Sequence, residues 1–229
     1  MLPCLIFDLD GTLLDTLDDL RSSLNYALQA KGLPLRTREQ VRKDVGNGVR
    51  VLIERSIEHP TPSAVDELLA IFRPHYAQHA SDTTAPYPGI LPMLRQVSLR
   101  GYRSAIVSNK PDAQVKALHQ RFFPHLILTA IGEQLPAVRR KPAPDMVILA
   151  LQRLQAAPSN AIYIGDSEVD LQTAQNAHIP CISCAWGFRG KALLQSAGAR
   201  TVIEQPEQLI PLIEAWSTSG CEQPQQLHL

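Results

Sequence analysis

Strand-like and helix-like segments alternate along most of this chain, and that alternation restricts its fold more than any other feature. Apolar, strand-like runs occur at residues 2–9, 102–108, 126–131, 161–165, 180–185 and 201–203. Helical periodicity separates most of them, at residues 90–99, 112–122, 144–154 and 168–177. Strands and helices that alternate at these lengths form βαβ units, which place parallel strands in one sheet with right-handed crossovers. We therefore expect an α/β fold with a parallel sheet.

One long segment between the first two strand-like runs contains no convincing strand. From Asp15 to about Thr83 the apolar residues follow helical spacing, and Pro74 should kink or end the last of these helices. An all-helical insertion in an α/β core indicates a cap. The expected parts are an α/β core of residues 1–15 and 84–216, a helical cap of residues 16–83, and a polar, disordered tail of residues 217–229.

The charges of the chain balance, with 22 basic and 22 acidic residues among 229. Such a chain has no net field that would attract nucleic acid or a membrane surface, so neither partner is expected. No apolar run reaches the roughly 18 residues that span a bilayer, and the first residues show no basic lead or cleavage site. We therefore expect a cytoplasmic protein, in agreement with cysteines that lie mostly in apolar, strand-like runs. The sequence carries no signal that distinguishes a monomer from a homodimer.

The first strand-like run ends in two acids. The segment DLDGT at residues 8–12 directly follows apolar residues, although a buried strand has no structural need for two carboxylates at its end. In an open α/β sheet, the carboxyl ends of the strands border the ligand-binding crevice, and N–H groups at a glycine turn can receive an anion. This geometry suits a phosphate or a metal ion. Asp8 and Asp10 can have separate roles, in nucleophilic attack or metal binding and in proton transfer, and the alternative is an ordinary Asp-Gly turn.

Three further polar segments fall where the sheet places the same crevice. SNKP at residues 108–111 follows the second strand, although a Ser-Asn pair is also a common helix N-cap. GDSEVD at residues 165–170 follows another strand and supplies carboxylate oxygens, which Mg²⁺ prefers. RRKPAP at residues 139–144 presents Lys141 before two prolines that stiffen the loop, and the alternative is a solvated basic loop.

Taken together, FDLDGT, SNK, KPxP and GDSxxD resemble the haloacid dehalogenase superfamily of phosphotransferases, in order and in spacing, over essentially the whole chain. The resemblance implies a Rossmann-like parallel sheet in three layers, with a small helical cap inserted after the first motif. It also implies a phosphomonoester hydrolase that depends on Mg²⁺ and forms an aspartyl-phosphate.

The resemblance also implies residue roles. Asp8 resembles the nucleophile, and Asp10 the acid/base that protonates the leaving alkoxide and later activates water, with its backbone carbonyl on the metal. Asp8 and Asp166 correspond to direct Mg²⁺ ligands, and Asp170 to a more distant or water-mediated partner. Lys141 offsets the repulsion between Asp8 and a phosphate dianion. The implied phosphoryl cradle consists of Lys141, Gly11, Thr12, Ser108 and Asn109.

Asp10 narrows the reaction class within the resemblance. Related ion-pumping ATPases carry Thr at this position and dehalogenases lack the Asp, whereas phosphatases and mutases retain it, so a haloacid substrate is not expected. A pyrophosphatase, a nucleotidase, a sugar-phosphate phosphatase and a β-phosphoglucomutase-like mutase remain alternatives on the same scaffold. A non-catalytic binding protein is disfavoured, because both aspartates, the lysine and the metal acid are all present.

Substrate choice must come from the cap, because the core motifs contact only the phosphate. In VGNGVR at residues 45–50, two glycines before a helix can direct N–H groups at an anion, and an arginine can add charge. The alternative is a plain turn between helices. The candidate substrate contacts in the cap are Gly46, Asn47, Gly48 and Arg50.

Residues 45–55 and the segment AWGFR at residues 185–189 resemble phosphoglycolate phosphatases. That resemblance implies 2-phosphoglycolate, a small phosphorylated metabolite, as the substrate. A cap that admits substrate and then excludes water must move, and we expect its hinges at residues 15–16 and 83–87.

Overall fold

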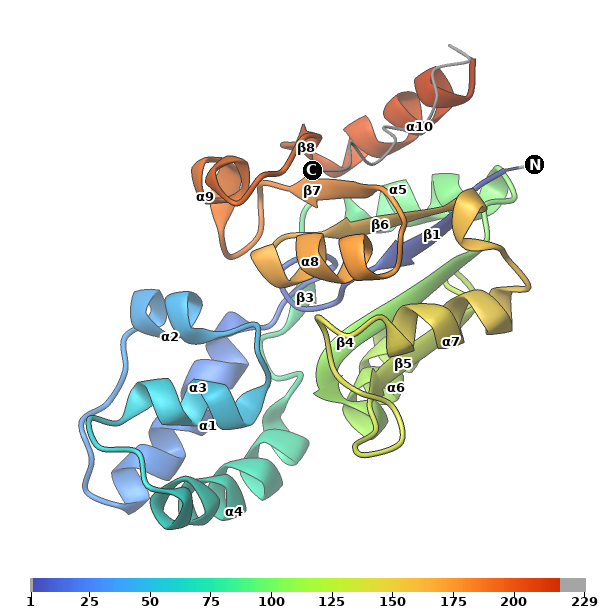
Figure 1. Ribbon diagram of the computed structural model, residues 1–229. Coiled ribbons are helices and arrows are strands. Elements are labelled where there is room, and N and C mark those ends of the chain that lie inside the picture. Colours follow the sequence, from blue (N-terminus) through green and yellow to red (C-terminus); the bar gives the residue numbers. More distant parts are fainter. Residues whose placement is uncertain (1, 219–229) are drawn as a thin grey trace.

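The computed structural model describes residues 2–218 and confirms the α/β fold with a parallel sheet. Six strands form this sheet in the order β5-β4-β1-β6-β7-β8, and each neighbouring pair runs parallel (Figure 1). All six predicted strands are present. Their bounds are β1 (Cys4–Phe7), β4 (Ser104–Pro111), β5 (Thr129–Glu133), β6 (Ala161–Gly165), β7 (Cys181–Cys184) and β8 (Val202–Ile203).

The helices of the core correspond to the predicted ones, and the described residues add four helical elements. The predicted helices are α5 (Ile90–Leu99), α6 (Asp112–Phe122), α7 (Asp145–Leu154) and α8 (Glu168–Asn176). The added elements are α9 (Gly190–Ser196), α10 (Leu209–Thr218) and the 3₁₀ helices η1 (Pro158–Asn160) and η2 (Pro206–Gln208). Residues 217–218 of the predicted tail end α10, and the other tail residues lie outside the described residues. Within residues 2–218, no helix combines the length and apolarity that a bilayer crossing requires.

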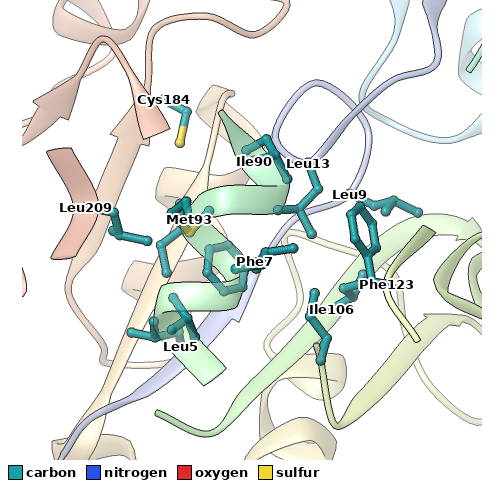
Figure 2. Close-up of a cluster of buried hydrophobic side chains, with 14 of the residues drawn as sticks. Leu5, Phe7, Leu9, Leu13, Ile90, Met93, Ile106, Phe123, Cys184 and Leu209 are labelled. Atoms are coloured by element: carbon teal, nitrogen blue, oxygen red, sulfur yellow. The ribbon is translucent and has the colours of Figure 1, made fainter. Parts of the chain in front are cut away.

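Alternate residues of the central strand bury opposite faces of the sheet, which produces the expected three layers. Leu5 and Phe7 of β1 pack with α5, α6 and α10, and Figure 2 shows them beside Met93 and Leu209. Residues Cys4 and Ile6 pack on the other face, with α7 and α8. A strand that is apolar on both faces is buried between two helical layers, so the charged residues of the core collect at the ends of the strands.

The inserted segment forms four helices, named the helical cap below: α1 (Leu17–Ala30), α2 (Arg38–Asp44), α3 (Val49–Ser56) and α4 (Pro62–His79). They bury a separate apolar cluster, to which the core adds Phe188. Figure 1 shows the cap as a distinct helical body beside the sheet. Helix α4 continues past Pro74, so the expectation that this proline could end it is wrong. Phe72 and Tyr76, both 1 % exposed, anchor the helix on either side of the proline.

A short antiparallel ribbon connects the cap to the core, and it was not predicted. Strand β2 (Leu14–Asp15) pairs with β3 (Ala85–Pro86) where the chain leaves the core and returns. The buried carboxylate of Asp19 on α1 accepts hydrogen bonds from the backbone N–H groups of Thr83 and Thr84. Two-residue strands carry no periodicity, so sequence patterns cannot reveal them.

Candidate active site

Two aspartates follow β1 and have different partners. Asp8 is buried, and its Oδ1 accepts a hydrogen bond from Lys141 Nζ at 2.6 Å. Asp10 Oδ2 accepts from Ser108 Oγ at 3.1 Å, and Lys110 Nζ lies 2.9 Å from Asp10 Oδ1. Each carboxylate therefore has its own ammonium, and the two lie in separate polar environments.

The pKa values of these two carboxyls shift in opposite directions. Burial and the charge of Asp170 raise the pKa of Asp8 well above its ordinary value, although a neighbouring ammonium opposes the shift. Burial would also raise the pKa of Asp10, but the Lys110 ammonium and hydrogen bonds such as that from Thr16 Oγ1, at 2.7 Å, lower it. Asp10 is thus stabilised as a carboxylate, whereas a negative charge on Asp8 needs further positive charge nearby.

Lys141 lies at the centre of the buried polar groups. Its Nζ is 2.6 Å from Asp8 Oδ1, 2.7 Å from Asp170 Oδ1 and 3.2 Å from Tyr163 OH. Although burial alone would lower the pKa of this ammonium, the two carboxylates raise it. The backbone of Lys141 is held as well, because Asn109 Oδ1 accepts from Lys141 N at 2.7 Å and Asn109 Nδ2 donates to Lys141 O at 3.1 Å. Lys141 is therefore a buried cation and not part of a solvated basic loop.

Three carboxylates make a candidate metal centre. One oxygen of each of Asp8, Asp166 and Asp170 lies within 4.8 Å of the others, and all three residues are buried. Burial, followed by the charge of Asp170, raises the pKa of Asp166 to about 7. Crowded carboxylates without enough positive charge resist ionisation, and hard oxygen donors are the ligands of Mg²⁺. The chemistry of this donor set therefore fits a divalent cation.

Two glycines allow the backbone to approach Asp166 closely. Gly11 has φ of +89°, and a Cβ there would lie 2.4 Å from Asp166 Oδ2. A Cβ on Gly187 would lie 2.3 Å from Gly11 O and 2.4 Å from Asp166 Oδ2. Asp166 also accepts hydrogen bonds from Thr12 Oγ1 at 3.3 Å and from Phe188 N at 2.7 Å. Any larger residue at either glycine would fill the space beside this carboxylate.

Not all residues that were predicted to hold metal contribute a carboxylate to this cluster. Asp8 and Asp166 belong to the carboxylate cluster. Asp10 was predicted to contact the metal through its backbone carbonyl, and its carboxylate faces Ser108 and Lys110. Asp170, predicted as a more distant partner, supplies an oxygen to the cluster.

The predicted phosphoryl cradle is only partly assembled around one cavity of about 60 Å³ between core and cap. Ser108, Asn109 and Lys141 line this cavity together with Asp8 and Asp10. Gly11 and Thr12 do not line it and lie against Asp166. The cap contributes apolar side chains to the same cavity, namely Leu20, Val45, Val49 and Leu52.

The four cap residues predicted to contact substrate are likewise divided. Gly46 and Gly48 line the cavity, whereas Asn47 and Arg50 do not. Arg50 forms an ion pair with Asp66 at the cap surface and lines a different cleft. Val49 faces the cavity, and the next position on a helix is rotated by about 100°, which carries the Arg50 side chain away. The structure therefore does not bring the expected arginine to the carboxylates.

Asp166 also lines the cavity, together with four core residues that the sequence did not assign: Lys110, Ser167, Phe188 and Arg189. Arg189 donates to the cap, from Nη1 to Arg42 O at 2.9 Å and from Nη2 to Val45 O at 2.7 Å. The sequence signal for Lys110, Phe188 and Arg189 was their place in SNK and AWGFR, since the partners of Lys110 and Arg189 in the cap are distant in the chain.

Comparisons with known proteins agree with this geometry. Residues 5–184 match the family model described as haloacid dehalogenase-like hydrolase. A phosphoglycolate phosphatase from Rhodobacter capsulatus is 35% identical over 225 residues, covering 96% of this chain and 100% of that protein. One from Pseudomonas putida is 31% identical over 235 residues, covering 97% and 81%. A solved structure from Lactobacillus delbrueckii subsp. bulgaricus, of a candidate phosphoglycolate phosphatase, has a TM-score of 0.88 and 36% identity, covering 92% of this chain and 98% of that one.

Proposed function

Because this chain belongs to the haloacid dehalogenase-like hydrolases, we propose that it is a Mg²⁺-dependent phosphomonoester hydrolase that forms an aspartyl-phosphate on Asp8. The observation that carries the proposal is that Asp8 and Asp10 have different ammonium partners. Their carboxylates lie near each other after one strand, but each has its own ammonium partner. Nucleophilic attack and proton transfer require two groups that are held in different environments.

In the first step, an Asp8 oxygen attacks phosphorus, and the bond from phosphorus to the ester oxygen breaks. Asp10 is a carboxylate in the free enzyme, takes up a proton when the negative phosphate binds beside it, and gives that proton to the leaving alkoxide. Lys141 Nζ, 2.6 Å from Asp8 Oδ1, offsets part of the repulsion between the attacking carboxylate and the phosphate.

In the second step, water attacks the phosphorus of the aspartyl-phosphate, and Asp10 takes a proton from that water. The bond from phosphorus to Asp8 breaks, which releases inorganic phosphate and restores the carboxylate. Ser108, Asn109 and Lys141, which line the cavity, hold the phosphoryl oxygens in both steps.

Asp8 and Asp166 would hold Mg²⁺, with the backbone carbonyl of Asp10 as a further ligand and Asp170 beside them. When bound, the ion supplies positive charge to the phosphoryl oxygens and to the crowded carboxylates. Asp170 keeps Lys141 in place through its Oδ1, 2.7 Å from the ammonium.

We propose 2-phosphoglycolate as the preferred substrate. The curated relatives named above are phosphoglycolate phosphatases. The cap covers the cavity with the apolar side chains of Leu20, Val49 and Leu52, which favours a small phosphoester over a nucleotide or a hexose phosphate. Arg189 carries the guanidinium that lines the cavity, and it also reaches the cap, so it replaces Arg50 as the candidate partner for the substrate carboxylate.

The test is a comparison of kcat/KM, with Mg²⁺ and free-phosphate detection, for 2-phosphoglycolate, pyrophosphate, nucleoside monophosphates and hexose phosphates. We expect 2-phosphoglycolate to lead the series and EDTA to abolish turnover. If all substrates are hydrolysed equally well, the substrate assignment fails while the phosphatase class survives. If none of these phosphate compounds is hydrolysed, the proposed function is wrong. Isomerisation of a sugar phosphate with little phosphate release would indicate a mutase.

A further inference from the structure

Lys110 is a buried cation that the proposed mechanism does not use. It ends the SNK segment of β4, and the residue is 6 % exposed. Its Nζ lies 2.9 Å from Asp10 Oδ1 and 2.5 Å from Tyr76 OH. A buried ammonium without an evident structural duty, placed on the proposed acid/base, requires an explanation.

The second partner of this ammonium belongs to the cap. Tyr76 lies on α4, is 1 % exposed, and stacks on Phe72 with ring centroids 5.2 Å apart. The Lys110 ammonium also lies 4.7 Å from the centroid of the Tyr76 ring. One side chain of the core thus contacts the catalytic carboxylate at one point and the cap at another.

The two oxygens of Asp10 are fixed by three donors. Oδ2 accepts from Ser108 Oγ, and Oδ1 accepts from Thr16 Oγ1 and contacts the Lys110 ammonium. Of these donors, Lys110 is the one that also contacts α4 of the cap. Displacement of the cap would remove the Tyr76 hydroxyl from Lys110 and leave the long lysine side chain with one fewer restraint.

We propose that Lys110 is a positioning residue that aligns the Asp10 carboxyl for proton transfer, and that Tyr76 makes this alignment depend on the closed position of the cap. The inference rests on the proposed function, in which Asp10 transfers protons. Its consequence is that proton donation to the leaving group is efficient only when the cap also excludes bulk water.

Two substrates with different leaving groups distinguish a positioning role of Lys110 from a purely structural one, because a structural defect would lower kcat/KM for both. An alkoxide, as released from 2-phosphoglycolate, needs a proton as the bond to phosphorus breaks, whereas the acetate released from acetyl phosphate is stable without one. The two substrates are similar in size, so the size of the cavity should affect both alike. Since kcat/KM reports steps up to the first irreversible one, it isolates the leaving-group step from the later attack of water.

The experiment measures kcat/KM for both substrates with wild type, Lys110→Met and Tyr76→Phe. For Lys110→Met we expect a loss of roughly 100-fold with 2-phosphoglycolate and less than about fivefold with acetyl phosphate. For Tyr76→Phe, which keeps the ring and removes one hydrogen bond, we expect a loss of roughly five- to tenfold with 2-phosphoglycolate alone, mainly in kcat. The matched control is Tyr26→Phe, because Tyr26 is also on the cap but is exposed and stacks on His75. Tyr26→Phe should leave kcat/KM unchanged for both substrates.

A double variant tests whether the two residues act as one unit. Lys110→Met combined with Tyr76→Phe should lose no more activity on 2-phosphoglycolate than Lys110→Met alone, because the tyrosine acts through the lysine. Additive losses would overturn that dependence. Thermal unfolding of each variant shows whether it is folded, and Tyr76→Phe decides the question if Lys110→Met does not fold.

The remaining outcomes separate this inference from the proposed function. If the Lys110 and Tyr76 variants lose kcat/KM equally for both substrates, or lose none, the positioning role is refuted, while the wild-type phosphatase activity is unaffected. A selective loss in Lys110→Met with none in Tyr76→Phe would refute the dependence on the cap. Wild-type protein that hydrolyses neither substrate would overturn the proposed function, and the inference with it.

Discussion

The core and the helical cap contribute opposite kinds of side chain to the cavity they share. From the core come charged groups, including Asp8, Asp10, Lys110 and Lys141. From the cap come mainly apolar side chains, such as Leu52, and the backbone of two glycines. The core therefore carries the chemistry, whereas the cap controls the size of the cavity and the access of water.

This difference has an electrostatic consequence. Interactions between charges strengthen as water is excluded, so an apolar cap increases the effect of each core charge on its neighbours. The opposite pKa shifts of Asp8 and Asp10 arise in this enclosed environment. Polar contacts across the boundary are few and specific, and they include Asn109 to Gly46 O at 3.1 Å and Arg189 to Val45 O at 2.7 Å.

The largest effect should come from the nucleophile of the core. Asp8→Asn replaces the attacking carboxylate with an amide, and we expect kcat for 2-phosphoglycolate to fall by roughly 10⁴-fold or more. Asp66→Asn, an exposed cap acid that pairs with Arg50, is the matched control and should remain near wild type. Activity in Asp8→Asn above one-tenth of wild type would exclude an aspartyl-phosphate at this position.

Loss of the central cation should have the second largest effect. Lys141→Ala leaves Asp8 and Asp170 without their shared ammonium, and we expect kcat to fall by about 10²- to 10³-fold. Lys191→Ala removes an exposed ion pair with Glu204 and serves as the control. A Lys141→Ala variant within fivefold of wild type would show that this ammonium does not act on the phosphoryl group.

A cap variant should change substrate selectivity instead of the chemistry. Leu52→Ala enlarges the cavity, so kcat/KM for glycerol 3-phosphate relative to 2-phosphoglycolate should rise by about tenfold. Leu28→Ala is the control, because Leu28 is fully buried in the cap but does not line the cavity. Both variants should lose about 2–4 kcal/mol of unfolding free energy, and only Leu52→Ala should shift selectivity. Equal selectivity in the two would contradict a sizing role for the cap.

The smallest effect should come from Arg50, which the sequence placed at the substrate. Its ion pair with Asp66 is at the surface, so Arg50→Ala should change kcat/KM for 2-phosphoglycolate by less than about twofold. Arg189→Ala should reduce the same quantity by roughly tenfold, because Arg189 lines the cavity and binds the cap. If Arg50→Ala is the more damaging of the two, the cap must adopt another arrangement when substrate binds.

The elements of the core could be predicted because their signals are local. The strand β1 is apolar on both faces, and each helix from α5 to α8 repeats its apolar residues at helical spacing. The ribbon of β2 and β3 has two residues per strand, which is too short for any periodicity. Helix α4 was expected to kink or end at Pro74 but continues across it, because burial of its neighbours outweighed the local preference.

The acids of the site could also be located from the sequence, since parallel strands bring their carboxyl ends to one edge. Asp8 and Asp166 therefore meet although they are far apart in the chain. Sequence reasoning did not resolve which neighbour each acid would bind. It treated Lys110 as part of a motif and assigned Arg50 to the substrate, whereas the structure pairs Lys110 with Asp10 and Arg50 with Asp66.

The sequence by itself determined the parallel sheet, the position of the helical insertion and the edge at which Asp8, Asp10, Lys141 and Asp166 gather. These properties depend on apolar periodicity and on strand direction, which are written locally along the chain. Only the tertiary structure decided that Tyr76 and Arg189 join the cap to the core and that Arg50 faces away. Such contacts depend on how two separate apolar clusters pack against each other, and this packing involves residues that no local pattern relates.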